Sequence, residues 1–108
     1  MLTLDVTNAR QYYGGVIQSL ADHMTGRVWN RENAPRLGPD IQRAAQKKLR
    51  QLNAAGTLND LRVPPGNRLE KLAGNRAGQY SIRVNDQYRI CFEWTEQGPA
   101  NVEITDYH

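Results

Sequence analysis

The chain has 108 residues, of which 39% are hydrophobic and 23% charged, and its formal net charge is +3. This length allows one hydrophobic core and therefore one domain. No apolar run approaches the roughly 20 residues of a membrane span and no secretory signal pattern occurs, so we expect a soluble, cytoplasmic protein without a membrane partner. The single cysteine, Cys91, lies in an apolar run and is expected to be a small buried side chain.

One segment in the second half of the chain is locally basic. Between Arg62 and Arg89 there are six basic residues and two acidic ones. A basic segment permits binding to a nucleic acid or to an acidic protein and does not decide between them.

Residues 1–15 differ from the remainder, because they are polar and lack a sustained hydrophobic period. We expect an N-terminal extension that is disordered or packed at the periphery. The alternation of Leu2, Leu4 and Val6 leaves a brief strand as the alternative. Residues 16–20 have the composition of a strand.

Two helices are predicted to follow. Asp22 is a suitable N-cap for a helix over residues 23 to 31. After breakers at residues 35–39, a second helix should begin near Asp40 and end with Gly56 as its C-terminal cap.

The second predicted helix is amphipathic, with a basic outer side. Its apolar residues recur at helical spacing, and its other faces carry basic and amide side chains. The apolar set is Ile41, Ala44, Ala45, Leu49 and Leu52, and the polar set is Gln42, Arg43, Lys47, Lys48 and Arg50. Such a face is usually only solvated, and contact with a nucleic acid is the alternative.

Beyond Gly56 the hydrophobic period changes to two, which predicts strands. A short strand is expected at residues 68–72, a hairpin at 80–84 and 88–94 with its turn at 85–87, and a final strand around 102–104. Tyr80, Ile82, Val84, Ile90, Phe92 and Trp94 should face the core, with Arg83 and Arg89 on the other face. The fold class is therefore α+β, with two N-terminal helices packed on a mainly antiparallel four- to five-stranded sheet.

Four motifs in one register carry a resemblance to a known family. They are PPGNRLEKL at 64–72, GNRAGQYSIR at 74–83, NDQYRICF at 85–92 and DYH at 106–108. Together they resemble the HigB-type toxins of bacterial toxin–antitoxin systems, in the RelE/ParE superfamily, over residues 16–108. Family members commonly begin at a strand that matches residues 16–20, which suggests Val16 as an alternative natural start.

The resemblance implies a RelE-like fold and a ribosome-dependent mRNA endoribonuclease, or mRNA interferase, that cuts in the ribosomal A site. It also implies a cognate helix-turn-helix antitoxin, with operator DNA bound only through the toxin–antitoxin complex. No cofactor is implied. No metal site is apparent in the sequence either, because the only histidines are His23 and His108 and no zinc-type spacing occurs.

RNA cleavage without a metal needs a base for the 2′-hydroxyl, charge stabilisation at the phosphate and an acid for the leaving 5′-oxygen. His108 is the natural proton-transfer group, since an imidazole titrates close to neutral pH. Asp106 is expected to act as a base or to orient His108, on one surface with Arg83 and Arg89. Tyr107 is expected to stack on a base or to donate a hydrogen bond. The alternatives are a solvated chain end for His108 and core packing for Tyr107.

The arginines are the expected phosphate ligands. Arg89 is the preferred clamp on the transition state, because a guanidinium binds phosphate oxygens in a bidentate manner. Arg83 should lie on the same face of the partner strand, and Arg68 and Arg76 are expected to position substrate or to contact the antitoxin.

The sequence departs from its family near residue 70. Some members carry a histidine and a lysine where this chain has Glu70 and Ala73. Because strand residues alternate, Lys71 is expected to project to the same face as position 73 and to supply the missing ammonium from two residues away. Glu70 is an alternative base.

Two rival functions follow from this departure and from the shared fold. One is a module that binds antitoxin or ribosome with weak or absent catalysis. The other is a ParE-like inhibitor of DNA gyrase, against which the DYH ending argues.

Overall fold

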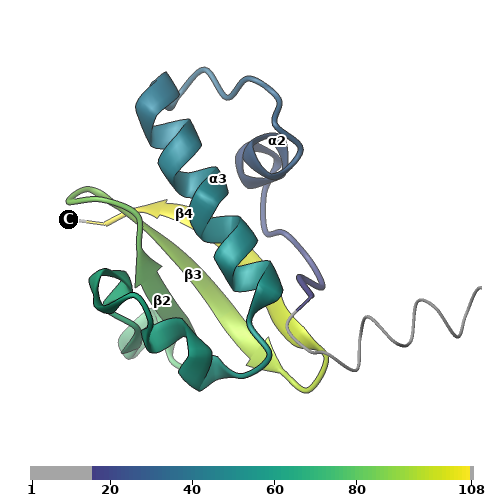
Figure 1. The fold of residues 1–108 in the computed structure, drawn as a ribbon, viewed down its shortest axis with the longest axis vertical. Helices are drawn as coiled ribbons and strands as arrows, with labels where there is room; N and C mark the ends of the chain where they lie inside the picture. The colour runs from purple at the N-terminus through teal and green to yellow at the C-terminus, as the bar shows by residue number, and fades with distance from the viewer. Residues whose placement is uncertain (1–15, 108) are drawn as a thin grey trace, which may run out of the picture.

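The computed structural model describes residues 16–107 and shows two helices followed by an antiparallel sheet (Figure 1). The helices are α2, His23–Trp29, and α3, Pro39–Ala54. The strands are β1, Glu70–Lys71, β2, Tyr80–Arg83, β3, Tyr88–Thr95, and β4, Gly98–Asp106. They lie in the order β1-β2-β3-β4, and every neighbouring pair is antiparallel. The α+β prediction is confirmed, whereas the expectations for residues 1–15 lie outside the described residues.

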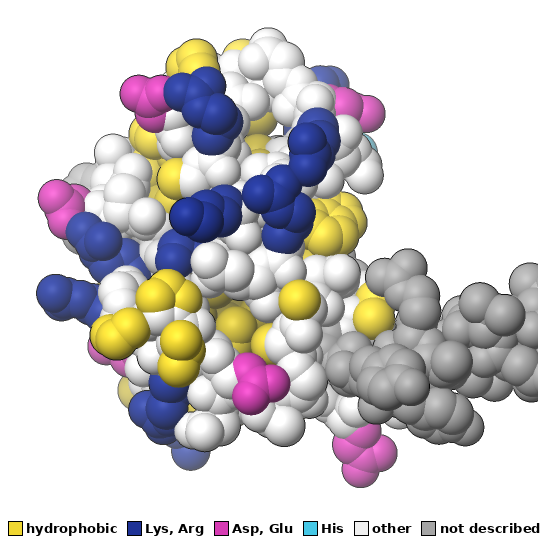
Figure 2. Space-filling model, viewed as in Figure 1, with side chains coloured by type: hydrophobic (Ala, Val, Ile, Leu, Met, Phe, Trp, Pro, Cys, Tyr) yellow, Lys and Arg dark blue, Asp and Glu magenta, His cyan; other side chains and the backbone are white. Residues whose placement is uncertain are grey.

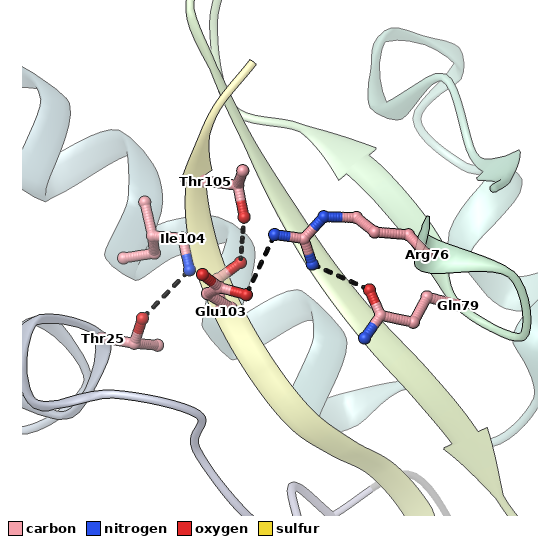
Figure 3. A network of polar contacts seen from close by, with 6 residues as sticks. All are labelled: Thr25, Arg76, Gln79, Glu103, Ile104 and Thr105. Carbon is pink, nitrogen blue, oxygen red and sulfur yellow. Dashed lines mark hydrogen bonds and ion pairs between the residues drawn. The ribbon is translucent and has the colours of Figure 1, made fainter. Parts of the chain in front are cut away.

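The helix α2 begins where the sequence predicts. The side chain of Asp22 accepts a hydrogen bond from the backbone N–H of Thr25 at 2.8 Å, as an N-cap does. The helix ends at Trp29, two residues before the predicted end, and Arg31 then adopts a left-handed φ of 62°. The buried hydroxyl of Thr25 accepts a hydrogen bond from the backbone N–H of Ile104 at 3.0 Å, which ties α2 to β4 (Figure 3).

The segment before α2 is not a regular strand. It runs beside β4 with one parallel bridge between Leu20 and Val102. The backbone N–H groups of Gln18 and Ala21 donate to the carbonyls of Pro99 and Val102, each at 2.8 Å. The segment has little room to continue pairing, because Asp22 opens a helix immediately afterwards.

Two predictions at the end of α3 are wrong. Its C-cap is Ala55, which is buried and extended at φ −69° and ψ 125°, so Gly56 does not cap the helix. Thr57 and Asp60 then form a capping box that starts the 3-10 helix η1, Leu58–Arg62. The spacing between Leu58 and Leu61 is therefore helical, where a period of two was expected.

Of the strand predicted at residues 68–72, only Glu70 and Lys71 form β1, and the backbone N–H of Leu72 adds one hydrogen bond to the carbonyl of Gln79 at 2.9 Å. The strand starts late because the 3-10 helix η2, Pro65–Asn67, ends at Arg68 in the left-handed conformation, with φ 46° and ψ 55°. It stops early because the chain turns into a third 3-10 helix, η3, Gly74–Arg76.

The core lies between the helices and one face of the sheet. The hairpin register sets Ile82 opposite Ile90 and Tyr80 opposite Phe92, and Ile90 opposes Ile104 on β4. These strands pack against buried helix and loop residues, which are Val28, Ala45, Leu49, Leu52 and Leu61. Trp94 is half-buried against the same core, and Cys91 is fully buried, as predicted. Among residues 16–107, no helix is long and apolar enough to cross a membrane.

Candidate functional site

Arg89 lies on the face of the sheet that points away from the helices. Its neighbour Ile90 is fully buried on the helix side, and successive residues of a strand point to opposite faces. Arg89 is opposite Arg83 on β2 and opposite Thr105 on β4. The prediction that Arg83 and Arg89 share the face away from the core is therefore confirmed. We call this surface the open face.

The guanidinium of Arg89 is held by groups of the protein on several sides. Its Nε donates to the hydroxyl of Ser81 at 2.7 Å, and one Nη donates to the carbonyl of Arg68 at 2.7 Å. Its central carbon lies 5.5 Å from the centroid of the Tyr107 ring. The other Nη donates to no group among the described residues. Arg89 thus presents an oriented pair of N–H donors to an anionic ligand.

Ser81 and the Arg68 carbonyl were not predicted to take part in the site. Ser81 is fully buried and lies opposite Cys91, so its hydroxyl is a fixed acceptor beneath Arg89. The carbonyl of Arg68 points at Arg89 from the left-handed turn that ends η2. The sequence could have indicated Ser81, because residues two positions apart in a strand point to the same face and Ser81 precedes Arg83 by two. No sequence pattern signals the Arg68 carbonyl.

The η2 turn that presents this carbonyl is anchored by a buried amide. Asn67 is fully buried and donates to the carbonyls of Leu61 and Val63 at 3.1 and 3.4 Å. Its Oδ1 accepts from the ammonium of Lys48 on α3 at 2.6 Å. Partial burial, followed by the nearby charges of Lys47 and Arg83, lowers the pKa of Lys48 below its ordinary value. A chain of contacts therefore links α3 to the turn that orients Arg89.

Tyr107 and Asp106 occupy different positions relative to Arg89. Tyr107 is 40% exposed, so its ring is not a core side chain, and its backbone N–H donates to the carbonyl of Gln87 at 2.7 Å. The expectation that Asp106 shares a surface with Arg89 is wrong, because Asp106 pairs in register with Tyr88, which places it on the opposite face. Its carboxylate accepts from the amide of Gln87 at 3.2 Å. His108 lies outside the described residues.

The short strand β1 places Glu70, rather than Lys71, on the open face. Glu70 is opposite Ser81, whose hydroxyl contacts Arg89, whereas Lys71 is opposite Tyr80 on the helix side. Both side chains are exposed. The ammonium that Lys71 was expected to supply is thus directed away from Arg89.

The remaining predicted arginines differ in how they are engaged. Arg83 forms an ion pair with Asp86 in the hairpin turn. The side chain of Arg68 is exposed beside the site. Arg76 reaches from η3 across the open face to Glu103 on β4 at 3.2 Å and also donates to Gln79 at 2.9 Å (Figure 3). Arg76 therefore holds η3 against the sheet.

The cations and carboxylates of the site do not form a cluster of metal ligands. In the part of the chain that is described, no three His, Cys, Asp or Glu side chains lie close enough together to hold a metal ion. The arrangement that is present, an oriented arginine beside an aromatic ring on a face that also carries Glu70, suits binding to a phosphodiester and a base of a single-stranded nucleic acid.

The chain is similar to proteins of one toxin family. Residues 18–108 match the family model of the RelE-like toxin of the type II toxin–antitoxin system HigB. "Toxin HigB-1" of Vibrio cholerae serotype O1 is 54% identical over 64 residues, which are 59% of this chain and 67% of that protein. An uncharacterized protein of Haemophilus influenzae is 38% identical over 69 residues, which are 64% of this chain and 67% of that protein.

A solved structure shows the same fold. The YoeB-YefM complex from Staphylococcus aureus contains a chain that superimposes with a TM-score of 0.55 at 18% identity. The alignment covers 85% of this chain and 94% of that one. At this identity the likeness concerns the fold alone.

Proposed function

The chain belongs to the HigB-like family of RelE-like toxins of type II toxin–antitoxin systems, and we propose that it is a ribosome-dependent mRNA endoribonuclease. The observation that carries this proposal is the fixed guanidinium of Arg89, which lies over the Tyr107 ring and whose second Nη donates to no group among the described residues. We propose that mRNA enters the A site of the ribosome and is cut there.

The proposed reaction is an internal transfer of the phosphodiester. The 2′-oxygen attacks the adjacent phosphorus while a base takes its proton, and the bond to the 5′-oxygen breaks as that oxygen receives a proton. The products are a 2′,3′-cyclic phosphate and a 5′-hydroxyl. Arg89 binds the phosphate oxygens and stabilises the charge that develops on them. Tyr107 stacks on a neighbouring base, and Arg83 and Arg68 bind flanking phosphates.

The proton-transfer groups of the proposal are His108 and two carboxylates. His108 protonates the leaving oxygen, in keeping with the usual role of an imidazole near neutral pH. Glu70 is the carboxylate that the strand register sets on the face of Arg89, and we assign it as the base. Asp106, on the other face, is assigned an orienting role at the chain end.

The proposed partners follow from the family. The chain is held inactive by a cognate helix-turn-helix antitoxin, and operator DNA is bound only through that complex. Its other partners are the ribosome and mRNA, so its site of action is the cytoplasm.

Induction of the chain in cells tests the proposal. The wild type should arrest growth and produce new 5′ ends within translated mRNA, and His108→Ala should abolish both effects. Ribosome association without new mRNA ends would instead support a non-catalytic binding module. Altered plasmid supercoiling would support inhibition of gyrase.

A further inference from the structure

One lysine of α3 contacts a buried side chain instead of remaining in solvent. Figure 2 shows Lys and Arg side chains gathered on the face of the molecule where α3 lies. Three of the four basic residues of α3 are exposed, whereas Lys48 is half-buried and its Nζ donates to the Oδ1 of Asn67 at 2.6 Å. Burial is the largest cause that lowers the pKa of Lys48. A lysine usually keeps its ammonium in water, so this contact is made at the cost of part of the hydration of the ion.

The ammonium of Lys48 determines which way the amide of Asn67 points. Asn67 is fully buried, and its amide nitrogen donates to the carbonyls of Leu61 and Val63 at 3.1 and 3.4 Å. An ammonium donates and never accepts, so it requires the amide oxygen to face it. A flipped amide would set its nitrogen against the ammonium and its oxygen against the two carbonyls, which would leave buried polar groups unpaired. Lys48 therefore fixes the orientation of a buried side chain.

Asn67 in turn holds a strained turn. The next residue, Arg68, has a left-handed backbone with φ 46° and ψ 55°, and its N–H donates to the carbonyl of Pro65 at 3.1 Å. A residue with a Cβ keeps this conformation only where the surrounding structure holds it there. The fully hydrogen-bonded side chain at the preceding position provides such a hold. The strained conformation directs the carbonyl of Arg68 to one Nη of Arg89, 2.7 Å away.

Lys48 and Arg89 lie on opposite sides of the sheet. The helix α3, which carries Lys48, packs against one face of the sheet, and Arg89 lies on the open face (Figure 1). Any effect of Lys48 on the site must therefore pass through the protein, by contacts or by charge. Without the ammonium, the amide of Asn67 would be free to turn and the strained turn free to relax. The carbonyl of Arg68 would then leave its Nη, and only the bond from Nε to Ser81 would remain.

From these contacts we propose that Lys48 is a positioning residue for the phosphate-binding arginine. It holds Asn67, Asn67 holds the left-handed turn, and the carbonyl of that turn fixes the guanidinium of Arg89. The consequence for RNA cleavage rests on the proposed function. The consequence for the orientation of Arg89 does not, because it follows from contacts within the chain.

Two measurements on the purified full-length chain test the proposal. The first is NMR of the guanidinium of Arg89, whose rotation about the Nε–Cζ bond is slowed by the hydrogen bond from Nη to the Arg68 carbonyl. Its signal is assigned by its loss in Arg89→Lys. The second is kcat and KM for cleavage of mRNA on 70S ribosomes. Lys48→Met keeps the stem and removes the ammonium, so the guanidinium should rotate faster, and kcat should fall about fivefold with little change in KM.

Three further variants separate positioning from charge and from stability. Lys48→Arg keeps a cation that donates and never accepts, and it should recover most of the lost kcat. Lys47→Met removes the same charge from an exposed neighbour on α3 and should behave as the wild type. Asn53→Ala removes another hydrogen bond of α3, from the backbone N–H of Ile17 at 2.8 Å. It should lower stability without changing kcat or the rotation of Arg89.

The outcomes keep this proposal apart from the proposed function. Wild-type rotation of Arg89 in a folded Lys48→Met protein would overturn the positioning role, whatever the rate of cleavage. Faster rotation with unchanged kcat would overturn its importance for catalysis. An equal loss of kcat in Lys47→Met would assign the effect to charge and would also overturn the proposal. A wild-type chain that does not cleave mRNA would contradict the proposed function, and the rotation rate would still decide whether Lys48 positions Arg89.

Discussion

The Nε of Arg89 donates a hydrogen bond of 2.7 Å to the hydroxyl of Ser81 on the neighbouring strand. Ser81 is fully buried, so this acceptor is fixed by the packing around it. With a second hydrogen bond to the carbonyl of Arg68, the contact restricts the guanidinium to one orientation. An arginine oriented in advance loses less freedom when it binds a phosphate.

Replacing Ser81 should impair catalysis more than substrate binding. Ser81→Ala removes the acceptor of Nε while Arg89 keeps its charge, so we expect kcat to fall about tenfold with little change in KM. The loss of stability should be about 1 kcal/mol, the usual contribution of one hydrogen bond. Single-turnover cleavage of ribosome-bound mRNA and urea unfolding measure the two effects. Ser19→Ala is the control, since the Ser19 hydroxyl also accepts one hydrogen bond, from the backbone of Asn101 at 2.8 Å, away from the site. Wild-type kcat in Ser81→Ala would show that Arg89 needs no such support.

The ring of Tyr107 should matter more than its hydroxyl. Its centroid lies 5.5 Å from the guanidinium carbon of Arg89, and a cation–π contact at an exposed position contributes about 0.5–1 kcal/mol. Tyr107→Phe should therefore cleave at nearly the wild-type rate, and Tyr107→Leu should be several-fold slower. If Tyr107→Phe cleaves as slowly as Tyr107→Leu, the hydroxyl is the functional group and the stacking assignment is wrong.

Glu70→Gln tests the carboxylate on the open face. Removing a general base usually slows a reaction by about 10²- to 10⁴-fold and takes away the rising limb of the pH–rate profile. Single-turnover cleavage measured across a pH series should show both effects. Glu96→Gln, in the exposed β3–β4 turn, is the matched control. A profile of unchanged shape in Glu70→Gln would transfer the role of base to another residue.

Asn67→Ala should destabilise the whole domain. The substitution leaves the carbonyls of Leu61 and Val63 without their amide donor and Lys48 without its acceptor, which should cost about 2–3 kcal/mol. Urea unfolding measures this loss. Asn59→Ala removes an exposed hydrogen bond to Arg62 and should change stability by less than about 0.5 kcal/mol. Equal effects of the two substitutions would contradict a structural role for Asn67.

Much of the open face could be predicted because strands have a period of two. Asn85 forms the hairpin turn, accepting from the backbone N–H groups of Gln87 and Tyr88, and this turn sets Arg83 opposite Arg89. The same alternation places Asp106 away from Arg89 and Tyr107 beside it. Alternation is a local property, so the sequence pattern carries it.

The contact that orients Arg89 through the carbonyl of Arg68 could not be predicted in this way, since it joins segments that are distant in the sequence. The carbonyl of Arg68 reaches Arg89 only because η2 ends in a left-handed residue and because Asn67 is tethered to α3. The capping box of Thr57 and Asp60 likewise produced a 3-10 helix where alternation was expected. Hydrogen bonds between side chain and backbone compete with strand formation, and hydrophobic periodicity does not report them.

The most direct test of the account is cleavage of a defined mRNA on purified 70S ribosomes by Arg89→Ala, compared with the wild type and with Arg62→Ala. The loss of one preorganised cation at the phosphate should reduce the rate of single-turnover cleavage by about 10²- to 10³-fold. Arg89→Lys should restore only part of that rate, since an ammonium cannot bind in a bidentate manner. Arg62→Ala should cleave as the wild type. Wild-type cleavage by a folded Arg89→Ala protein would contradict the assignment of Arg89 as the phosphate clamp.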